Sequence, residues 1–115
     1  MEVIKSFEGI SFDEPNCQIS EIARLEERVV QVTCIKLESK KPWEHFAFHG
    51  SVVIGVVMGA GKINSDDGSF EVVPQSWIIL NQGERISVIP DEDMHLIRIG
   101  SPIHSFEERT PYVDF

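Results

Sequence analysis

The sequence predicts an all-β domain that is organised as a sandwich or a barrel. Its 115 residues are enough for one domain with a single hydrophobic core. Short apolar segments follow one another along the chain, and each ends in residues typical of turns. No segment has the apolar spacing of a long helix. Because many short strands separated by turns are typical of sandwiches and barrels, we expect this fold class.

The strand at the centre of the chain is the clearest of the predicted elements. Val52 to Met58 form a continuous apolar run, which the segment Gly59-Ala60-Gly61 ends. A run of this kind is typical of a strand that is buried on both faces. We therefore expect residues 52–58 to lie in the interior of the barrel.

The beginning of the chain predicts short edge strands. Its apolar residues are sparse and come in pairs, at Val3/Ile4 and Ile10/Phe12. Residues 13–16 contain Pro15, whose fixed φ favours a turn. These edge strands would therefore be separated from the following segment by a turn.

The next segment allows either a strand or a brief helical turn, because Ile19, Ile22 and Ala23 have helical spacing. From Arg28 to Leu37 the content of β-branched residues rises, which predicts a strand. Lys40-Lys41-Pro42 then ends this strand.

Further strands are predicted in the second half of the chain, at residues 43–48, 69–73, 77–80, 86–89 and 94–99. The Asp67-Gly68 step supplies the positive φ of a tight hairpin before residues 69–73. In the last strand, alternation places Met94, Leu96 and Arg98 on one face and His95, Ile97 and Ile99 on the other.

One domain is expected over residues 1–115. Residues 42–100 form the barrel core, residues 1–38 add N-terminal strands, and residues 104–115 form a tail. The tail ends in Tyr112-Val113-Asp114-Phe115, whose apolar side chains either dock on the barrel or on a second subunit, or fray at the terminus.

The charge composition argues against several classes of partner. The formal net charge is −9, and the ten Lys and Arg residues do not cluster. Such a chain repels nucleic acid and anionic membrane surfaces, so we expect neither as a partner. No segment approaches the roughly 20 apolar residues of a membrane span.

The N-terminus lacks the basic start and apolar core of a secretory signal, which predicts a cytoplasmic protein. Cys17 and Cys34 do not form a CxxC pair, and in that compartment we expect them to be reduced. Cys34 is interpreted as a small core residue. A disulfide between the two is the alternative.

Residues 42–99 resemble the cupin family, whose fold is a double-stranded β-helix or jelly-roll barrel. The likeness lies in the order of strand, Gly-x-Gly turn, hairpin, strand, turn and strand. One family motif is His-x-His, three or four residues, Glu, six residues and Gly. With Gly59 as its glycine, the ligand positions fall on His45, Ala47 and Val52.

The second family motif is Pro-x-Gly-x-x-His. With Gly83 as its glycine, the Pro position falls on Asn81 and the His position on Ile86. Both turn-forming glycines are therefore kept, whereas His45 is the only one of the family's metal ligands that is present. The resemblance implies a cupin-type barrel that has lost the family's metal site, so we expect no metal and no cofactor.

A metal site rebuilt from other residues is the alternative. His45 and His49 are four residues apart, a spacing of ~13 Å along a strand, which a bulge at Gly50 would shorten. His95 could approach from another strand. The structural interpretations are a hydrogen-bonded interior residue for His45, a loop residue for His49, a barrel-wall residue for His95 and a loop or tail residue for His104.

The candidate ligand pocket combines the family's ligand positions with two tryptophans, whose rings suit sugars and planar ligands. Its residues are Trp43, His45, Ala47, Val52, Trp77 and Ile86. Both tryptophans could instead fill the core, and we favour this for Trp77 because it lies in an apolar strand. Trp43 should share the face of His45. Glu84 and Arg85 fall at the turn that forms the rim of the family's pocket.

Three functions compete at this point. We favour the binding of an unidentified small molecule in a metal-free, apolar barrel pocket. The second function is that of an enzyme, either an isomerase or epimerase with His45 as its base or a metal-dependent dioxygenase with the rebuilt site. The third is a structural role as a homodimer, paired through edge strands, the N-terminal segment or the tail.

Overall fold

The computed structural model describes residues 3, 10–14, 17–25, 30–48 and 50–100. Every regular element in this part of the chain is a β-strand, and the strands form two antiparallel sheets. The all-β class is therefore confirmed. No helix among the described residues is long and apolar enough to cross a membrane.

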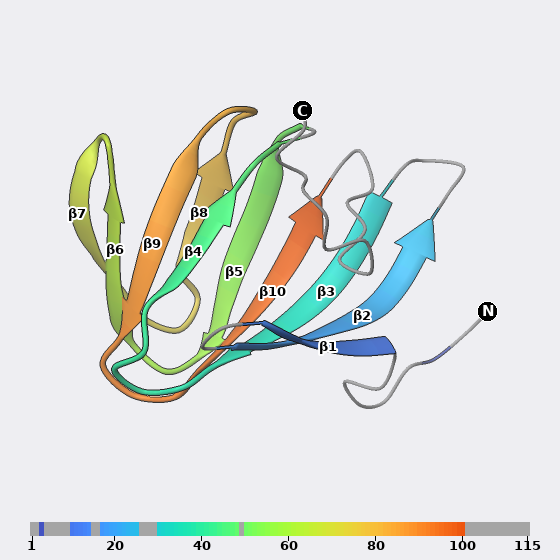
Figure 1. The fold of residues 1–115 in the computed structure, drawn as a ribbon, viewed down its shortest axis with the longest axis horizontal. Helices are drawn as coiled ribbons and strands as arrows, with labels where there is room; N and C mark the ends of the chain where they lie inside the picture. Colours follow the sequence, from blue (N-terminus) through green and yellow to red (C-terminus); the bar gives the residue numbers. More distant parts are fainter. Residues whose placement is uncertain (1–2, 4–9, 15–16, 26–29, 49, 101–115) are drawn as a thin grey trace.

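The strands follow one another with short connections (Figure 1). They are β1 (Ile10–Glu14), β2 (Cys17–Leu25), β3 (Val30–Leu37), β4 (Trp43–Phe46), β5 (Val52–Met58), β6 (Gly61–Ser65), β7 (Gly68–Val72), β8 (Trp77–Leu80), β9 (Arg85–Pro90) and β10 (Met94–Gly100).

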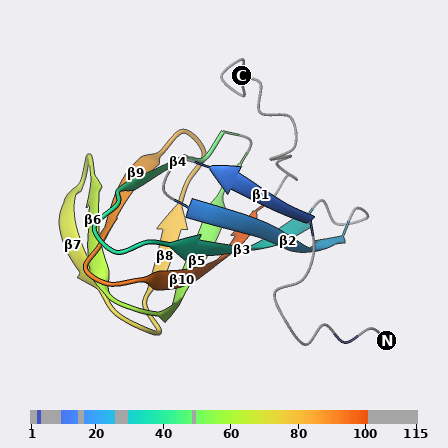
Figure 2. The same ribbon diagram turned by 60° about the horizontal axis from the view of Figure 1, so that its bottom comes forward.

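The two sheets have the orders β1-β2-β3-β10-β5-β8 and β4-β9-β6-β7. From β3 onward the chain passes from one sheet to the other at every step except the β6–β7 hairpin, which is the connectivity of a jelly roll. The sheets face each other, with β1 and β2 at one end and the β6–β7 hairpin at the other (Figures 1 and 2).

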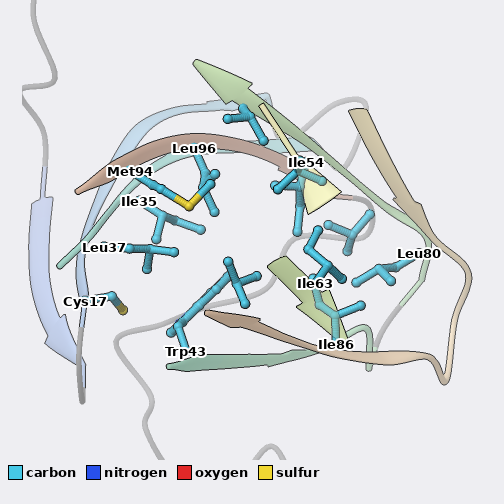
Figure 3. Packing of buried hydrophobic residues seen from close by; sticks show 14 of the residues in the cluster. Cys17, Ile35, Leu37, Trp43, Ile54, Ile63, Leu80, Ile86, Met94 and Leu96 are labelled. Atoms are coloured by element: carbon cyan, nitrogen blue, oxygen red, sulfur yellow. The ribbon is translucent and has the colours of Figure 1, made fainter. Parts of the chain in front are cut away.

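The hydrophobic core fills the space between the sheets (Figure 3). Alternation along each strand supplies it, because every second side chain faces the opposite sheet. In β10, for example, Met94 and Leu96 are fully buried, whereas His95 and Ile97 between and after them are only partly buried. The predicted division of this strand into two faces is therefore confirmed.

Of the two alternatives for the segment around Ile19, the structure has the strand and not the helical turn. Ile19 lies in β2 and pairs with Ile35 of β3, and both side chains are fully buried. Pairing decides between the two alternatives, since the ladder with β3, shifted once between Glu21 and Ala23, satisfies the backbone of this segment and places Ile19 in the core. The predicted strand at Ile10/Phe12 is confirmed as β1, whereas Ile4 lies outside the described residues and Val3 is exposed outside any strand.

The prediction that residues 52–58 are buried on both faces is also wrong. Val52, Ile54 and Val56 face the core, but Val57 and Met58 are each 47% exposed. The opposing sheet covers only the inner face of β5, so the outer residues of this apolar run meet no second layer of described strands.

The two glycines of the family motifs shape turns, as the resemblance implies. Gly59 has a φ of 87° and Gly83 a φ of 92°, in the region that favours glycine. A Cβ at Gly59 would also lie 2.2 Å from the carbonyl oxygen of Asp93. The turn after β5 is therefore packed against the β9–β10 connection and requires glycine on both grounds.

Both cysteines are buried and neither forms a disulfide. Cys17 belongs to the core between the sheets, whereas Cys34 alternates with the inward-facing Thr33 and Ile35 of β3. Burial raises the pKa of the Cys34 thiol, an effect that nearby Lys36 partly opposes. The prediction of a buried Cys34 is confirmed.

Candidate functional site

The four family ligand positions all lie in the interior of the barrel. His45 and Ile86 face each other as paired residues of β4 and β9. Ala47 follows β4, where its N–H donates to the carbonyl of Glu84, and Val52 begins β5 in the opposite sheet. All four are at least nine-tenths buried. The strands thus place these positions inside the barrel, as the motif alignment predicts.

The interior contains a polar cluster around Arg98 of β10. The Nε of Arg98 donates to Nε2 of His45 at 2.9 Å, and its Nη1 donates to Oε1 of Gln31 at 3.3 Å. Arg98 is 3% exposed, Gln31 is fully buried and His45 is 7% exposed. Three strands from both sheets therefore meet in one buried hydrogen-bonded group.

These contacts fix the state of the His45 ring. Burial lowers the pKa of Arg98 to about 10, so its guanidinium is protonated at neutral pH. A guanidinium has donors only, so Nε2 of His45 must accept with its lone pair. His45 is therefore neutral at Nε2 and carries its ring proton on Nδ1.

Neighbouring residues hold this cluster in position. The Trp43 and His45 rings stack with centroids 5.2 Å apart and planes 14° apart, which confirms that they share a face. A Cβ at Gly100 would lie 2.6 Å from Nη1 of Arg98, so the guanidinium occupies the space above this glycine. Sequence reasoning placed Arg98 on the same face as Met94 and Leu96 but did not recognise it, Gln31 or Gly100 as parts of a site.

An open pocket lies at the other end of the barrel, between β8 and the β6–β7 hairpin. Its volume is about 530 Å³. The apolar part of its lining comes from both sheets and consists of Ile63, Phe70, Val72, Trp77, Ile78, Ile79, Leu80 and Ile86. Its charged residues are Asp66, Asp67, Glu71, Glu84 and Arg85, so the two residues predicted for the rim of the family's pocket line this one.

The structure separates the six predicted pocket residues. Ile86 and Trp77 line the open pocket, whereas Trp43, His45, Ala47 and Val52 are packed in the interior and do not line it. Ile86 connects the two regions, because it borders the pocket and pairs with His45. The pocket could not be read from the motif alignment, since its other walls come from the hairpin and from β8.

The expectation that Trp77 fills the core is wrong. Trp77 is 64% exposed and pairs with Gly55, and a Cβ on that glycine would lie 2.6 Å from the indole ring. The ring therefore lies over Gly55 on the outer face of the larger sheet. An apolar run such as 77–80 does not alternate with polar residues, so its pattern cannot indicate which residues face outward.

Comparison with known proteins finds similarity in structure alone. No protein-family model matches the sequence, and no curated protein matches it in sequence. An ectoine synthase from P. lautus superposes with a TM-score of 0.81 and 10% identity, over 94% of this chain and 83% of that one. An RmlC-like cupin from Shewanella frigidimarina has a TM-score of 0.78 and 14% identity, over 93% and 96% of the two chains. The chain has the cupin fold.

Other structures with the cupin fold agree with this result. KdgF from Halomonas sp. has a TM-score of 0.72 and 18% identity, over 83% of this chain and 89% of that one. These identities are low, so the similarity establishes the fold and transfers no activity.

The residues at the cupin metal positions do not fit a metal. Ala47, Val52 and Ile86 offer no donor atom, and their side chains are 1–2% exposed within the packed core. The Nε2 lone pair of His45 accepts from a guanidinium cation, an arrangement that directs it away from any metal. Among the described residues, no group of three or more His, Cys, Asp or Glu could hold a metal ion.

The alternative site rebuilt from histidines is not assembled by the described residues. His45 lies in the smaller sheet and faces the interior. His95 lies in the larger sheet, where it alternates with the fully buried Met94 and Leu96 and is therefore on the outer side. The two imidazoles are therefore separated by a sheet. His49 and His104 lie outside the described residues.

Proposed function

We propose that this protein binds a small molecule in the pocket between β8 and the β6–β7 hairpin, without a metal. The observation that carries the proposal is the pocket of about 530 Å³, which is open, whereas His45, Ala47 and Val52 at the cupin ligand positions are enclosed by packing. Its volume lies within the range of roughly 300–1,000 Å³ typical of small-molecule sites.

The lining of the pocket supports a ligand with an apolar body. Phe70 is 51% exposed although it belongs to the pocket wall, and Ile78 is only partly buried. Apolar side chains that are exposed within a concavity gain free energy when a ligand removes them from water, at about 25 cal/mol per Å² of apolar area. A ligand that covers them would therefore be held mainly by the hydrophobic effect.

A blocking variant tests the proposal. Ile78→Trp places an indole in the pocket and should abolish the binding of phenylbutanol, a neutral apolar probe, measured by isothermal calorimetry. Val57→Trp adds the same indole on the outer face of β5 and should bind the probe as the wild type does. Equal binding by the wild type and Ile78→Trp would overturn the proposal.

Catalysis stays an alternative prediction, because solved structures with this fold include enzymes such as the ectoine synthase of P. lautus. No feature of the site favours it. His45, the predicted base, is buried against Arg98 and does not line the open pocket. His45→Ala would leave any turnover unchanged if His45 takes no part in it.

A homodimer is favoured by one specific surface. Trp77 and Ile79 of β8 are 64% and 67% exposed, and they share the outer face of the larger sheet with Val57 and Ile99. Surfaces of exposed, contiguous apolar side chains commonly mark protein interfaces. We propose that two copies meet through this face, and sedimentation equilibrium at increasing concentration would show a dimer. A cytoplasmic location stays a prediction.

A further inference from the structure

The charges around the open pocket are strongly unbalanced. Asp66, Asp67, Glu71 and Glu84 contribute carboxylates to its lining, and Arg85 is the one basic residue among those that line it. Asp66 and Asp67 lie together in the β6–β7 turn, while Glu84 lies in the turn before β9. The mouth of an apolar cavity is therefore bordered by acidic groups from two separate turns.

Arg85, the single cation among the lining residues, lies against an aromatic ring. The guanidinium carbon of Arg85 lies 4.8 Å from the centre of the Phe46 ring, in a cation–π contact. Phe46 does not line the pocket but lines a shallower depression beside it. Arg85 and Asp66 both line the pocket and this depression, so the guanidinium offsets part of the acidic charge, and the four carboxylates still outnumber it.

The four carboxylates differ in their surroundings. Glu71 lies opposite Lys62 in the β6–β7 register, so part of its charge faces a lysine. Oε1 of Glu84 accepts from the backbone N–H of Asn81 at 2.6 Å, which fixes this carboxylate at the rim. For Asp67, the backbone N–H donates to Oγ of Ser65, so the turn does not depend on the charge of the side chain. Asp66 and Asp67 are thus the charges that can be removed most cleanly.

We propose that the pocket selects apolar molecules that carry a positive charge, as an arylalkyl amine does. The inference rests on the proposed function, since it concerns the ligand class of the same pocket. The apolar body would lie against the side chains from the two sheets, and the ammonium would lie between the carboxylates at the mouth. The half-exposed ring of Phe70 adds a face over which a cation is attracted.

Electrostatics work against the opposite ligand class. An anionic ligand would meet four lining carboxylates in a chain whose formal net charge is −9. A neutral ligand would gain the hydrophobic contribution alone. The pocket should therefore rank ligands of one shape by their charge, in the order cation, neutral molecule, anion.

Three probes of matched shape test this ranking: phenylbutylamine, phenylbutanol and phenylbutyrate, with affinities measured by isothermal calorimetry. We expect the amine to bind about five- to tenfold more tightly than the alcohol at low salt, and the acid more weakly than the alcohol. The preference should shrink as salt is added, because exposed charges are screened.

The source of the preference is tested by two variants with the same change in net charge. Asp66→Asn/Asp67→Asn keeps residues that favour the turn and should remove most of the preference for the amine, with alcohol binding unchanged. Asp91→Asn/Glu92→Gln removes two charges at the opposite end of β9 and should keep the preference.

The outcomes separate this inference from the proposed function. If the wild type binds the alcohol and the amine equally, the charge preference is wrong and the binding pocket stands. If no probe binds, both are wrong. If the two double variants lose the preference equally, it arises from the overall net charge and the proposed role of the rim is wrong.

Discussion

The replacement of metal ligands by apolar side chains does not leave the interior uniformly apolar. Arg98, Gln31 and His45 lie inside a barrel whose other inward positions are mostly aliphatic. A buried guanidinium costs several kcal/mol of desolvation, which its hydrogen bonds must offset. The three side chains therefore depend on one another for their hydrogen bonds. Removing one of them leaves the others buried with fewer partners, which lowers the free energy of unfolding.

Substitution of Arg98 should show this coupling. Arg98→Ala leaves acceptors on His45 and Gln31 without this donor and opens a cavity, so we expect a loss of about 3–5 kcal/mol in the free energy of unfolding. Arg98→Met fills most of the volume without a charge and should cost less than half as much. Urea denaturation measures both values, and a cost below about 1 kcal/mol for the alanine variant would contradict the cluster's role.

The sequence pattern predicted which residues share a strand face, but it did not predict that His45, Gln31 and Arg98 contact one another. Alternation placed Arg98 on one face with Met94 and Leu96, and His45 on one face with Trp43, because period two is fixed by the pleat. Their contact joins positions 53 residues apart in two different sheets, which no local pattern specifies. The burial of the arginine was also unexpected, since a lone arginine in an apolar strand is usually exposed at its charged end.

At the scale of elements, turn chemistry was the most informative signal. The Asp67-Gly68 step lies in the β6–β7 hairpin as predicted, and the predicted strands from Trp43 onward correspond to β4, β5 and β7 to β10 within a few residues. The incorrect predictions concern which face of a strand is buried. The exposed side of β5 and the outward position of Trp77 depend on which face of the larger sheet the smaller sheet covers. That packing is set by the tertiary fold and not by the local sequence.

The two motif glycines should differ in their tolerance of a side chain. Gly83→Ala meets no atom within 4 Å and should cost only the strain of a left-handed backbone, about 1 kcal/mol. Gly59→Ala adds a collision with the Asp93 carbonyl and should cost about 2–4 kcal/mol. Thermal or urea unfolding of the two variants gives the comparison, and equal costs would contradict the close packing of the turn after β5.

For the whole molecule, the jelly roll separates two regions that the motif alignment had merged. One end of the interior holds the former ligand positions and is closed by packing, while the open pocket lies toward β8 and the β6–β7 hairpin. The sequence predicted the barrel. It could not predict the pocket, because its walls come from elements whose distance is set only when both sheets have formed.

Binding in this pocket without a metal is the central claim, and one measurement tests it most directly. Phenylbutanol is titrated into isotopically labelled protein, and backbone amide signals are followed by heteronuclear NMR, first with a chelator present and then with added Zn²⁺ or Fe²⁺. We predict shifts centred on β8, the β6–β7 hairpin and residues 83–86 at the start of β9, with the same affinity in both conditions. Binding that requires the metal, or shifts centred on His45 in β4, would contradict the claim.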